Sequence, residues 1–207
     1  KVVVVSATSE ESESTEASKE SAMEVSKAVN AEVSATMQAV GVTVTKVTCD
    51  VADVEDVEKL VETVVEEFSG IHGKIDVLVN NAGVMAPKAV AESMTEETSD
   101  DEEWEEVIEV NVTGTFNLTQ AALPAMKKFS DAAAKKRFVG TIVNVASVAG
   151  STMGSPGSQA AYSASKAAVE SFTKSLAMEL SPYSASVAMV RVNAVAPGYV
   201  ETDALES

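Results

Sequence analysis

Tyr162 and Lys166 stand four residues apart in the stretch Ala161-Tyr-Ser-Ala-Ser-Lys166, and these two residue types can move a proton together. On a helix, this spacing places both side chains on one face, a single turn apart. A phenol has a free pKa of about 10, and a neighbouring ammonium group favours the phenolate, which makes proton transfer easier near neutral pH. The pair therefore indicates acid or base chemistry, although the same spacing also occurs on ordinary helix surfaces.

Apolar residues that recur every four positions predict the helix that would carry this pair. The stripe consists of Ala168, Phe172, Leu176 and Leu180, with Val169 and Met178 alongside. A period close to that of the α-helix places such residues on one buried side. We therefore expect a helix over 161–180.

Strands and helices alternate along the rest of the chain. Short apolar or alternating runs predict strands at 1–5, 42–49, 75–79, 139–145 and 187–195. Helical patterns lie between them at 23–41, at 53–68 and at 104–126, the last with a bend near Gly114. This alternation predicts one α/β domain over 1–207, with a doubly wound parallel sheet and helices on both faces.

Polar residues gather where these predicted strands end. The clusters are Asp50-Val51, Asn80 to Gly83, Ser147 and Pro197-Gly198. In open parallel sheets, ligands bind at the carboxyl ends of the strands. Core packing needs no asparagine pair and no serine at these positions, so the pattern predicts a ligand site at this edge.

The composition narrows the classes of partner. The 207 residues include 15 basic and 32 acidic side chains, and the net charge of −17 disfavours nucleic acid and anionic membranes as partners. The single cysteine, Cys49, is expected to be a small buried residue, and the single histidine, His72, a surface residue. A single cysteine cannot form a disulfide within the chain, and one cysteine with one histidine cannot make up a Cys/His metal cluster. We therefore expect no metal site.

The expected compartment follows from the same features. No run approaches the length that a bilayer requires, and no signal-peptide pattern opens the chain. A lone cysteine is typical of a reducing environment. We therefore expect a cytoplasmic protein with no membrane partner, while the stroma or matrix of an organelle stays open.

The ordered motifs together resemble those of the short-chain dehydrogenase/reductase family. They are Asn80-Asn-Ala-Gly83, Asn111, Ser147, Tyr162-x-x-x-Lys166 and Asn193 to Gly198. The stretches 74–83 and 111–120 look especially like its 3-oxoacyl-acyl-carrier-protein reductase branch. The resemblance implies a Rossmann-like fold and NADP(H)-dependent reduction of a small-molecule or carrier-bound carbonyl, such as a 3-oxoacyl thioester in fatty acid synthesis.

The resemblance also implies a role for each matched residue. Tyr162 would give a proton to the carbonyl oxygen, Lys166 would hold the nicotinamide ribose, and Ser147 would hydrogen-bond the carbonyl oxygen. Asn111 would bend its helix so that water could connect Lys166 with solvent. The cofactor-binding set that the resemblance implies is Ser6, Asp50, Val51, Asn80, Ala82, Gly83, Tyr162, Lys166, Pro197, Gly198 and Thr202.

The chain departs from the family at both ends. Its first glycine is Gly41, so the strand at 1–5 is not followed by the glycine-rich turn that holds a pyrophosphate. Residues 5–10 look like the end of the family's second strand, and few residues follow Thr202. We therefore expect a fragment that lacks the first strand, its glycine loop and the C-terminal end. No acidic residue occurs at 6–9, which favours NADP, with NAD still possible.

Two alternative functions remain open. The first is another dehydrogenase of the same family that acts on an alcohol, a sugar or a steroid. The second is a catalytically silent scaffold that lacks cofactor binding. The family pairs its subunits through helices that correspond to 104–126 and 161–180, so the resemblance also implies a homodimer or homotetramer.

Overall fold

A computed structural model describes residues 2–6, 44–67, 75–85, 101–127, 138–151, 159–181 and 189–199. The elements in chain order are β1 (Val2–Ser6), β2 (Val44–Thr48), α2 (Val54–Glu67), β3 (Val77–Asn80), α4 (Asp101–Ile108), the π-helical turn η2 (Glu109–Thr113), α5 (Gly114–Lys127), β4 (Phe138–Val145), α6 (Val148–Ser151), α7 (Ala160–Glu179) and β5 (Met189–Val195). Each described strand lies within a few residues of its predicted position. The predicted helix at 23–41 and the residues His72 and Thr202 lie outside the described residues.

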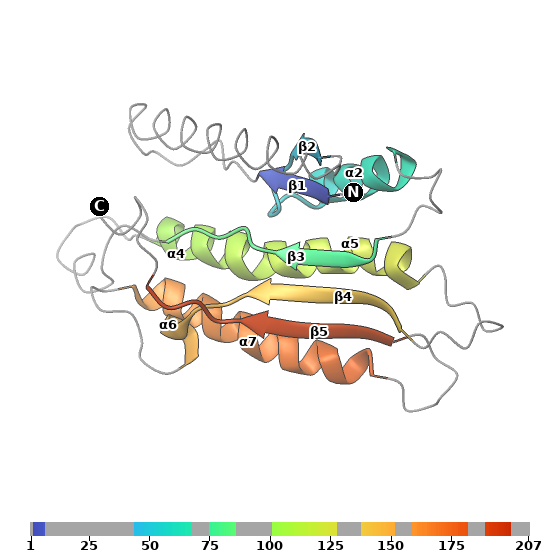
Figure 1. The fold of residues 1–207 in the computed structure, drawn as a ribbon. Coiled ribbons are helices and arrows are strands. Elements are labelled where there is room, and N and C mark those ends of the chain that lie inside the picture. Colours follow the sequence, from blue (N-terminus) through green and yellow to red (C-terminus); the bar gives the residue numbers. More distant parts are fainter. Residues whose placement is uncertain are drawn as a thin grey trace.

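All the described strands are parallel to their neighbours, as the sequence predicts. β1 pairs with β2, and a second sheet has the order β3-β4-β5. The arrows of β1, β3, β4 and β5 point the same way in Figure 1, so their carboxyl ends face one side of the molecule. β1 and β3 are not hydrogen-bonded to each other, and the described sheet therefore has two parts.

Helices α2, α5 and α7 lie on the same side of these strands (Figure 1). One buried cluster joins α5 and α7 to the larger sheet and contains Met126, Ile142, Leu176, Val190 and Val192. A second cluster joins α2 and α5 to the strand end after β2 and contains Cys49, Val57, Leu60 and Leu118. Leu78 of β3 packs against both clusters, so the helix layer connects the two parts of the sheet.

The opposite face of the larger sheet is open in the described part of the chain. Along β3, Leu78 packs on the helices, whereas Val77 and Val79 are 59% and 53% exposed. On β5, Val192 is buried and Val195 is 47% exposed. The described helices therefore cover one face, and the expected second layer is not found among them.

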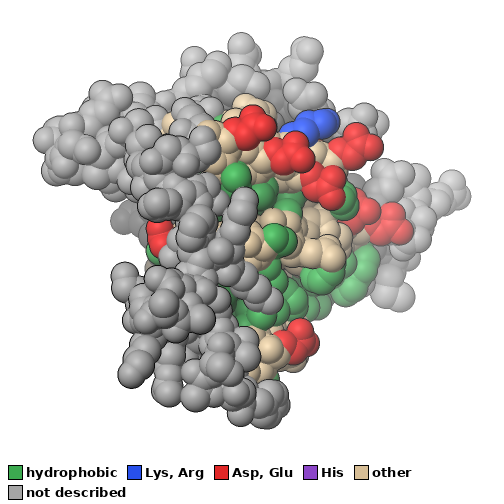
Figure 2. Space-filling model, turned by 90° about the vertical axis from the view of Figure 1, so that its right-hand side faces the viewer, with side chains coloured by type: hydrophobic (Ala, Val, Ile, Leu, Met, Phe, Trp, Pro, Cys, Tyr) green, Lys and Arg blue, Asp and Glu red, His purple; other side chains and the backbone are tan. Residues whose placement is uncertain are grey.

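Asp53 explains where α2 begins. Its Oδ1 accepts hydrogen bonds from the backbone N–H groups of Glu55 and Asp56, at 2.7 and 3.1 Å. A capping aspartate of this kind stabilises a helix by about 1 kcal/mol. Figure 2 shows acidic side chains gathered near a basic one on the upper part of the face that it presents. In α2, Lys59 Nζ lies 3.4 Å from Asp56 Oδ1, and both side chains are exposed.

Cys49 is the small buried residue that the sequence predicts, with 2% of its surface exposed. Burial, followed by the nearby carboxylates of Asp56, Asp50 and Asp53, raises the pKa of its thiol to about 11. A thiol with such a pKa stays protonated at neutral pH and is a poor nucleophile.

None of the described helices has the length and apolar character needed to cross a membrane.

Candidate active site

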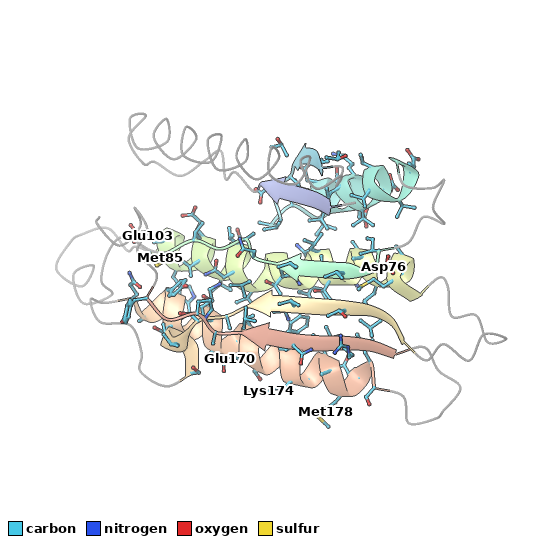
Figure 3. All side chains as sticks on the ribbon, in the orientation of Figure 1. Asp76, Met85, Glu103, Glu170, Lys174 and Met178 are labelled. Atoms are coloured by element: carbon cyan, nitrogen blue, oxygen red, sulfur yellow. The ribbon has the colours of Figure 1, made fainter. Side chains whose placement is uncertain are left out.

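The ends of β4 and β5 bring two of the predicted clusters together. The N–H of Ala146 donates to the carbonyl of Val195 at 2.8 Å, and the N–H of Val148 donates to the carbonyl of Pro197 at 3.1 Å. Ser147 lies between these two bonds in the chain and is therefore adjacent to Pro197. In Figure 3, Met85 and Glu103 lie at this end of the molecule, whereas Asp76 lies at the opposite end of β3.

Tyr162 and Lys166 share one side of α7, as their spacing predicts. The Lys166 Nζ lies 5.6 Å from the centre of the Tyr162 ring. The same Nζ donates a 2.8 Å hydrogen bond to the carbonyl of Val145, the last residue of β4. This bond fixes the ammonium group of α7 at the carboxyl edge of the sheet.

Lys166 is buried, with 4% of its surface exposed. Among the described residues, no carboxylate lies within salt-bridge distance of its ammonium group. Burial without a counter-ion favours the neutral amine, and it lowers the pKa of Lys166 below its usual value. An ammonium group has three N–H donors, and the bond to Val145 uses one of them.

Asn111 lies in the π-helical turn η2 of the long helix, and its side chain holds the loop after β3. Its Oδ1 accepts a 2.8 Å bond from the N–H of Val84, and its Nδ2 donates a 3.0 Å bond to the carbonyl of the same residue. Nδ2 also donates to the Ser165 hydroxyl at 2.9 Å. The amide therefore joins the loop after β3, the π-helical turn η2 and α7.

The π-helical turn η2 ends where Gly114 begins α5. The N–H of Gly114 donates to the carbonyl of Glu109, five residues back, as a π-helix requires. The backbone carbonyl of Asn111 accepts a 2.8 Å bond from the Thr115 hydroxyl. The long helix is therefore irregular just before Gly114, where the sequence predicts a bend; the bend itself and the water path from Lys166 stay predictions.

Gly83 and Gly150 allow two close approaches around Lys166. A Cβ atom at Gly83 would lie 3.1 Å from Asn111 Oδ1 and 3.2 Å from Lys166 Nζ. A Cβ atom at Gly150 would lie 2.5 Å from the backbone nitrogen of Ala167. Gly83 therefore borders the ammonium group directly, and Gly150 lets α6 pack against the backbone of α7.

Several of the remaining predicted site residues lie near the surface at the ends of strands. Ser147 is half-buried, and its Oγ accepts a 3.2 Å bond from the N–H of Ala149, while Pro197 and Gly198 are exposed beside it. Ala82 is half-buried in the loop after β3, and Ser6 ends β1 in register with Thr48. These residues lie at carboxyl ends of strands, where a ligand could reach them.

Asn80 and Val51 are instead packed inside the protein. Asn80 is 5% exposed, and its Nδ2 donates to Thr119 Oγ1 at 3.0 Å and to Asn144 Oδ1 at 2.8 Å. Val51 is 2% exposed, and a Cβ atom at Gly114 would lie 2.6 Å from its Cγ2. After β2, Asp50 is half-buried and its Oδ1 accepts a 2.9 Å bond from the N–H of Ala52, and the carbonyl of Val51 accepts a 3.3 Å bond from Asn117 Nδ2.

Ser165 and Gly150 belong to this site although no motif singled them out. The buried side of α7 is offset from the predicted stripe, and Met178 is 66% exposed. The buried residues of α7 are Ala161, Ser165, Lys166, Val169, Thr173 and Leu176. Apart from the adjacent pair Ser165 and Lys166, they are spaced three or four residues apart, which was visible in the sequence. Three of them are polar, however, and do not count as core in a hydrophobic pattern.

Comparisons with known proteins identify the family of this chain. Residues 7–207 match the profile of the family described as short chain dehydrogenase, and the chain belongs to that family. It is 40% identical over 161 residues to a 3-oxoacyl-[acyl-carrier-protein] reductase of Synechocystis, covering 78% of this chain and 55% of the relative. It is 43% identical over 157 residues to the corresponding reductase of Thermotoga maritima, covering 76% and 54%.

Solved structures show the same Rossmann-like fold. NAD+-bound xylitol dehydrogenase superimposes with a TM-score of 0.65 at 33% identity, over 84% of this chain and 58% of that one. The structure titled gox2181 gives 0.66 at 32% identity, over 86% and 61%. The chain spans about half the length of the curated relatives that it matches.

The contact between α6 and α7 predicts that Gly150→Ala destabilises the protein by about 1–3 kcal/mol, because the new methyl group meets helix backbone that cannot move aside. Gly198→Ala is the matched control, because a Cβ atom there would meet nothing within 4 Å. Urea unfolding of both variants measures the difference. Equal midpoints for the two variants would contradict the packing described at Gly150.

The buried ammonium group predicts that Lys166→Met makes the folded state more stable at pH 7, by about 1 kcal/mol, because the cost of burying the charge disappears. The pKa of Lys166 is lower in the folded protein than its usual 10.5. The cost is therefore full at low pH and fades as the pH rises toward 10.5. Unfolding midpoints at pH 7 and pH 10 test this: a stability gain for Met that does not shrink at the higher pH would refute it.

Proposed function

We propose that this chain is part of one Rossmann-like domain that reduces a carbonyl with NADP(H), and that the substrate is a 3-oxoacyl thioester of acyl-carrier protein in fatty acid synthesis. The supporting observation is the buried Lys166, held at the end of β4 beside the Tyr162 ring and beside Gly83. The names of the relatives described above support the choice of substrate. Cys49, reduced and buried, suits a cytoplasmic location.

The proposed chemistry assigns each polar side chain one task. A nicotinamide cofactor, when bound, supplies the hydride. The Tyr162 hydroxyl donates a proton to the carbonyl oxygen, and the Lys166 ammonium stabilises the negative charge that develops on the phenol oxygen. The Ser147 hydroxyl donates a hydrogen bond to the same carbonyl oxygen, and Asn111 keeps the loop after β3 in place.

The described residues fit the nicotinamide end of such a cofactor. Within the part of the chain that the structure describes, two N–H donors of Lys166 have no acceptor and could bond ribose hydroxyls, and the missing side chain of Gly83 leaves space beside them. Pro197 and Gly198 are exposed at the neighbouring strand end. Residues 1–40 contain no glycine, so this stretch has no glycine-rich turn to hold the pyrophosphate.

Two alternatives each have an observation in their favour. The likeness to NAD+-bound xylitol dehydrogenase favours an alcohol or sugar dehydrogenase that uses NAD. The lack of a glycine-rich turn in 1–40 favours a scaffold without cofactor binding. The charge pattern separates neither of them from the reductase.

We also propose that the chain forms a homodimer, or a homotetramer built from it, through α5 and α7. Phe116 is 47% exposed and packs edge to face on Phe172, with ring centres 6.3 Å apart. These rings border a cavity of about 270 Å³ that is lined by Val112, Thr113, Thr115, Phe116, Val169 and Phe172. An apolar hollow with an exposed aromatic ring is the kind of surface that a second copy covers.

The catalytic proposal predicts that Tyr162→Phe lowers the reduction of an acetoacetyl thioester by NADPH by about 100-fold or more, because the proton donor is lost while the ring remains. NADPH affinity, followed by its fluorescence, should change less than threefold. Faster oxidation of xylitol with NAD than reduction of the thioester would favour the dehydrogenase alternative. No saturable binding at millimolar NADPH would favour the scaffold.

The proposed interface predicts that Phe116→Asp converts the assembly to monomers, because a carboxylate would be buried in an apolar contact. Sedimentation velocity of the variant and of wild type at equal concentration measures the change. Glu109→Gln is a suitable control, since Glu109 is exposed one helical turn outside the cavity lining. An unchanged mass for Phe116→Asp would place the interface elsewhere.

A further inference from the structure

We propose that Ser165 is a positioning residue of this site, acting through Asn111 and the backbone of Tyr162. The expected effect of Ser165 on turnover rests on the proposed function. The chain of hydrogen bonds through Asn111 and Ser165 does not rest on it. Ser165 lies directly before Lys166 and is fully buried, with 0% of its surface exposed. A serine hydroxyl in such a place needs partners of its own, because water cannot reach it.

The Ser165 hydroxyl makes two bonds whose directions are fixed. The Oγ donates to the carbonyl of Tyr162 at 2.7 Å. It accepts from Asn111 Nδ2 at 2.9 Å. A hydroxyl has a single proton, so the bond to the Tyr162 carbonyl uses it, and the oxygen lone pairs remain for Asn111.

The orientation of the Asn111 amide is equally determined. Val84 presents an N–H and a carbonyl to it, and an N–H can meet only the amide oxygen. The two Nδ2 protons then go to the Val84 carbonyl and to Ser165. Ser165 is thus the acceptor that completes the hydrogen bonding of a side chain with 1% of its surface exposed.

The bonds form one continuous clasp from the backbone of Val84 through Asn111 and Ser165 to the backbone of Tyr162. The clasp spans the narrow space around Lys166, since a Cβ atom at Gly83 would approach both Asn111 Oδ1 and Lys166 Nζ. It therefore sets how far the loop after β3 stands from the first turn of α7. That separation determines where a ligand beside Gly83 meets the phenol and the ammonium.

Removing the hydroxyl leaves one Nδ2 proton of Asn111 buried without an acceptor, so the amide or the Val84 loop must shift. Small misplacements of reacting groups have large kinetic effects. We expect Ser165→Ala to lower kcat about tenfold or more with KM changed less than threefold, and to shift the pH dependence of kcat through the altered surroundings of Lys166. Ser175→Ala, an exposed serine on the same helix, is the matched control and should match wild type.

Hydrogen exchange tests the clasp independently of turnover. The Val84 N–H is bonded to Asn111, so Ser165→Ala should speed its exchange about tenfold or more, while Ser175→Ala leaves it unchanged. If Ser165→Ala does not fold, Ser165→Cys keeps most of the volume with a weaker acceptor and should show an intermediate effect. Wild-type exchange at Val84 in a folded Ala or Cys variant overturns the proposal. If the wild-type chain shows no turnover but the Ser165→Ala variant exchanges faster at Val84, the result counts against the proposed reaction and not against the role of Ser165.

Discussion

The hydrogen bond from Lys166 to the carbonyl of Val145 is the interaction on which the site depends. It draws a buried ammonium group from α7 onto the end of β4, although no carboxylate among the described residues compensates its charge. Burying a cation in this way costs free energy. The structure around the ammonium group is closely packed, since a Cβ atom at Gly83 would lie 3.2 Å from Lys166 Nζ and one at Gly150 would lie 2.5 Å from the backbone nitrogen of Ala167.

The π-helical turn at η2 serves the same arrangement. It brings Asn111 to a position from which its amide reaches both the loop after β3 and α7. In a regular α-helix, Asn111 would face a different direction. Such π-helical turns are often found at functional sites. The π-helical turn and the buried Lys166 therefore form one connected arrangement, because side-chain hydrogen bonds of Asn111 connect the turn to α7.

Much of this fold could be predicted from the sequence because its strands are short, apolar and separated by clear helical patterns. The placement of Tyr162 and Lys166 on one side of α7 followed from helix geometry. Ser165 could not be found in this way, since its role depends on Asn111 and Val84, which are distant in the chain. The burial of Val51 was also invisible, because only the packed structure shows that Gly114 leaves room for it.

The most direct test of the account is hydrogen exchange of the wild-type chain with and without saturating NADPH. The account predicts slower exchange at 82–84, 145–150 and 195–199, the segments that surround Lys166 at the carboxyl ends of the strands, and no change along α2. Protection confined to α2 or absent from all three segments at saturation would contradict a nicotinamide site at this edge.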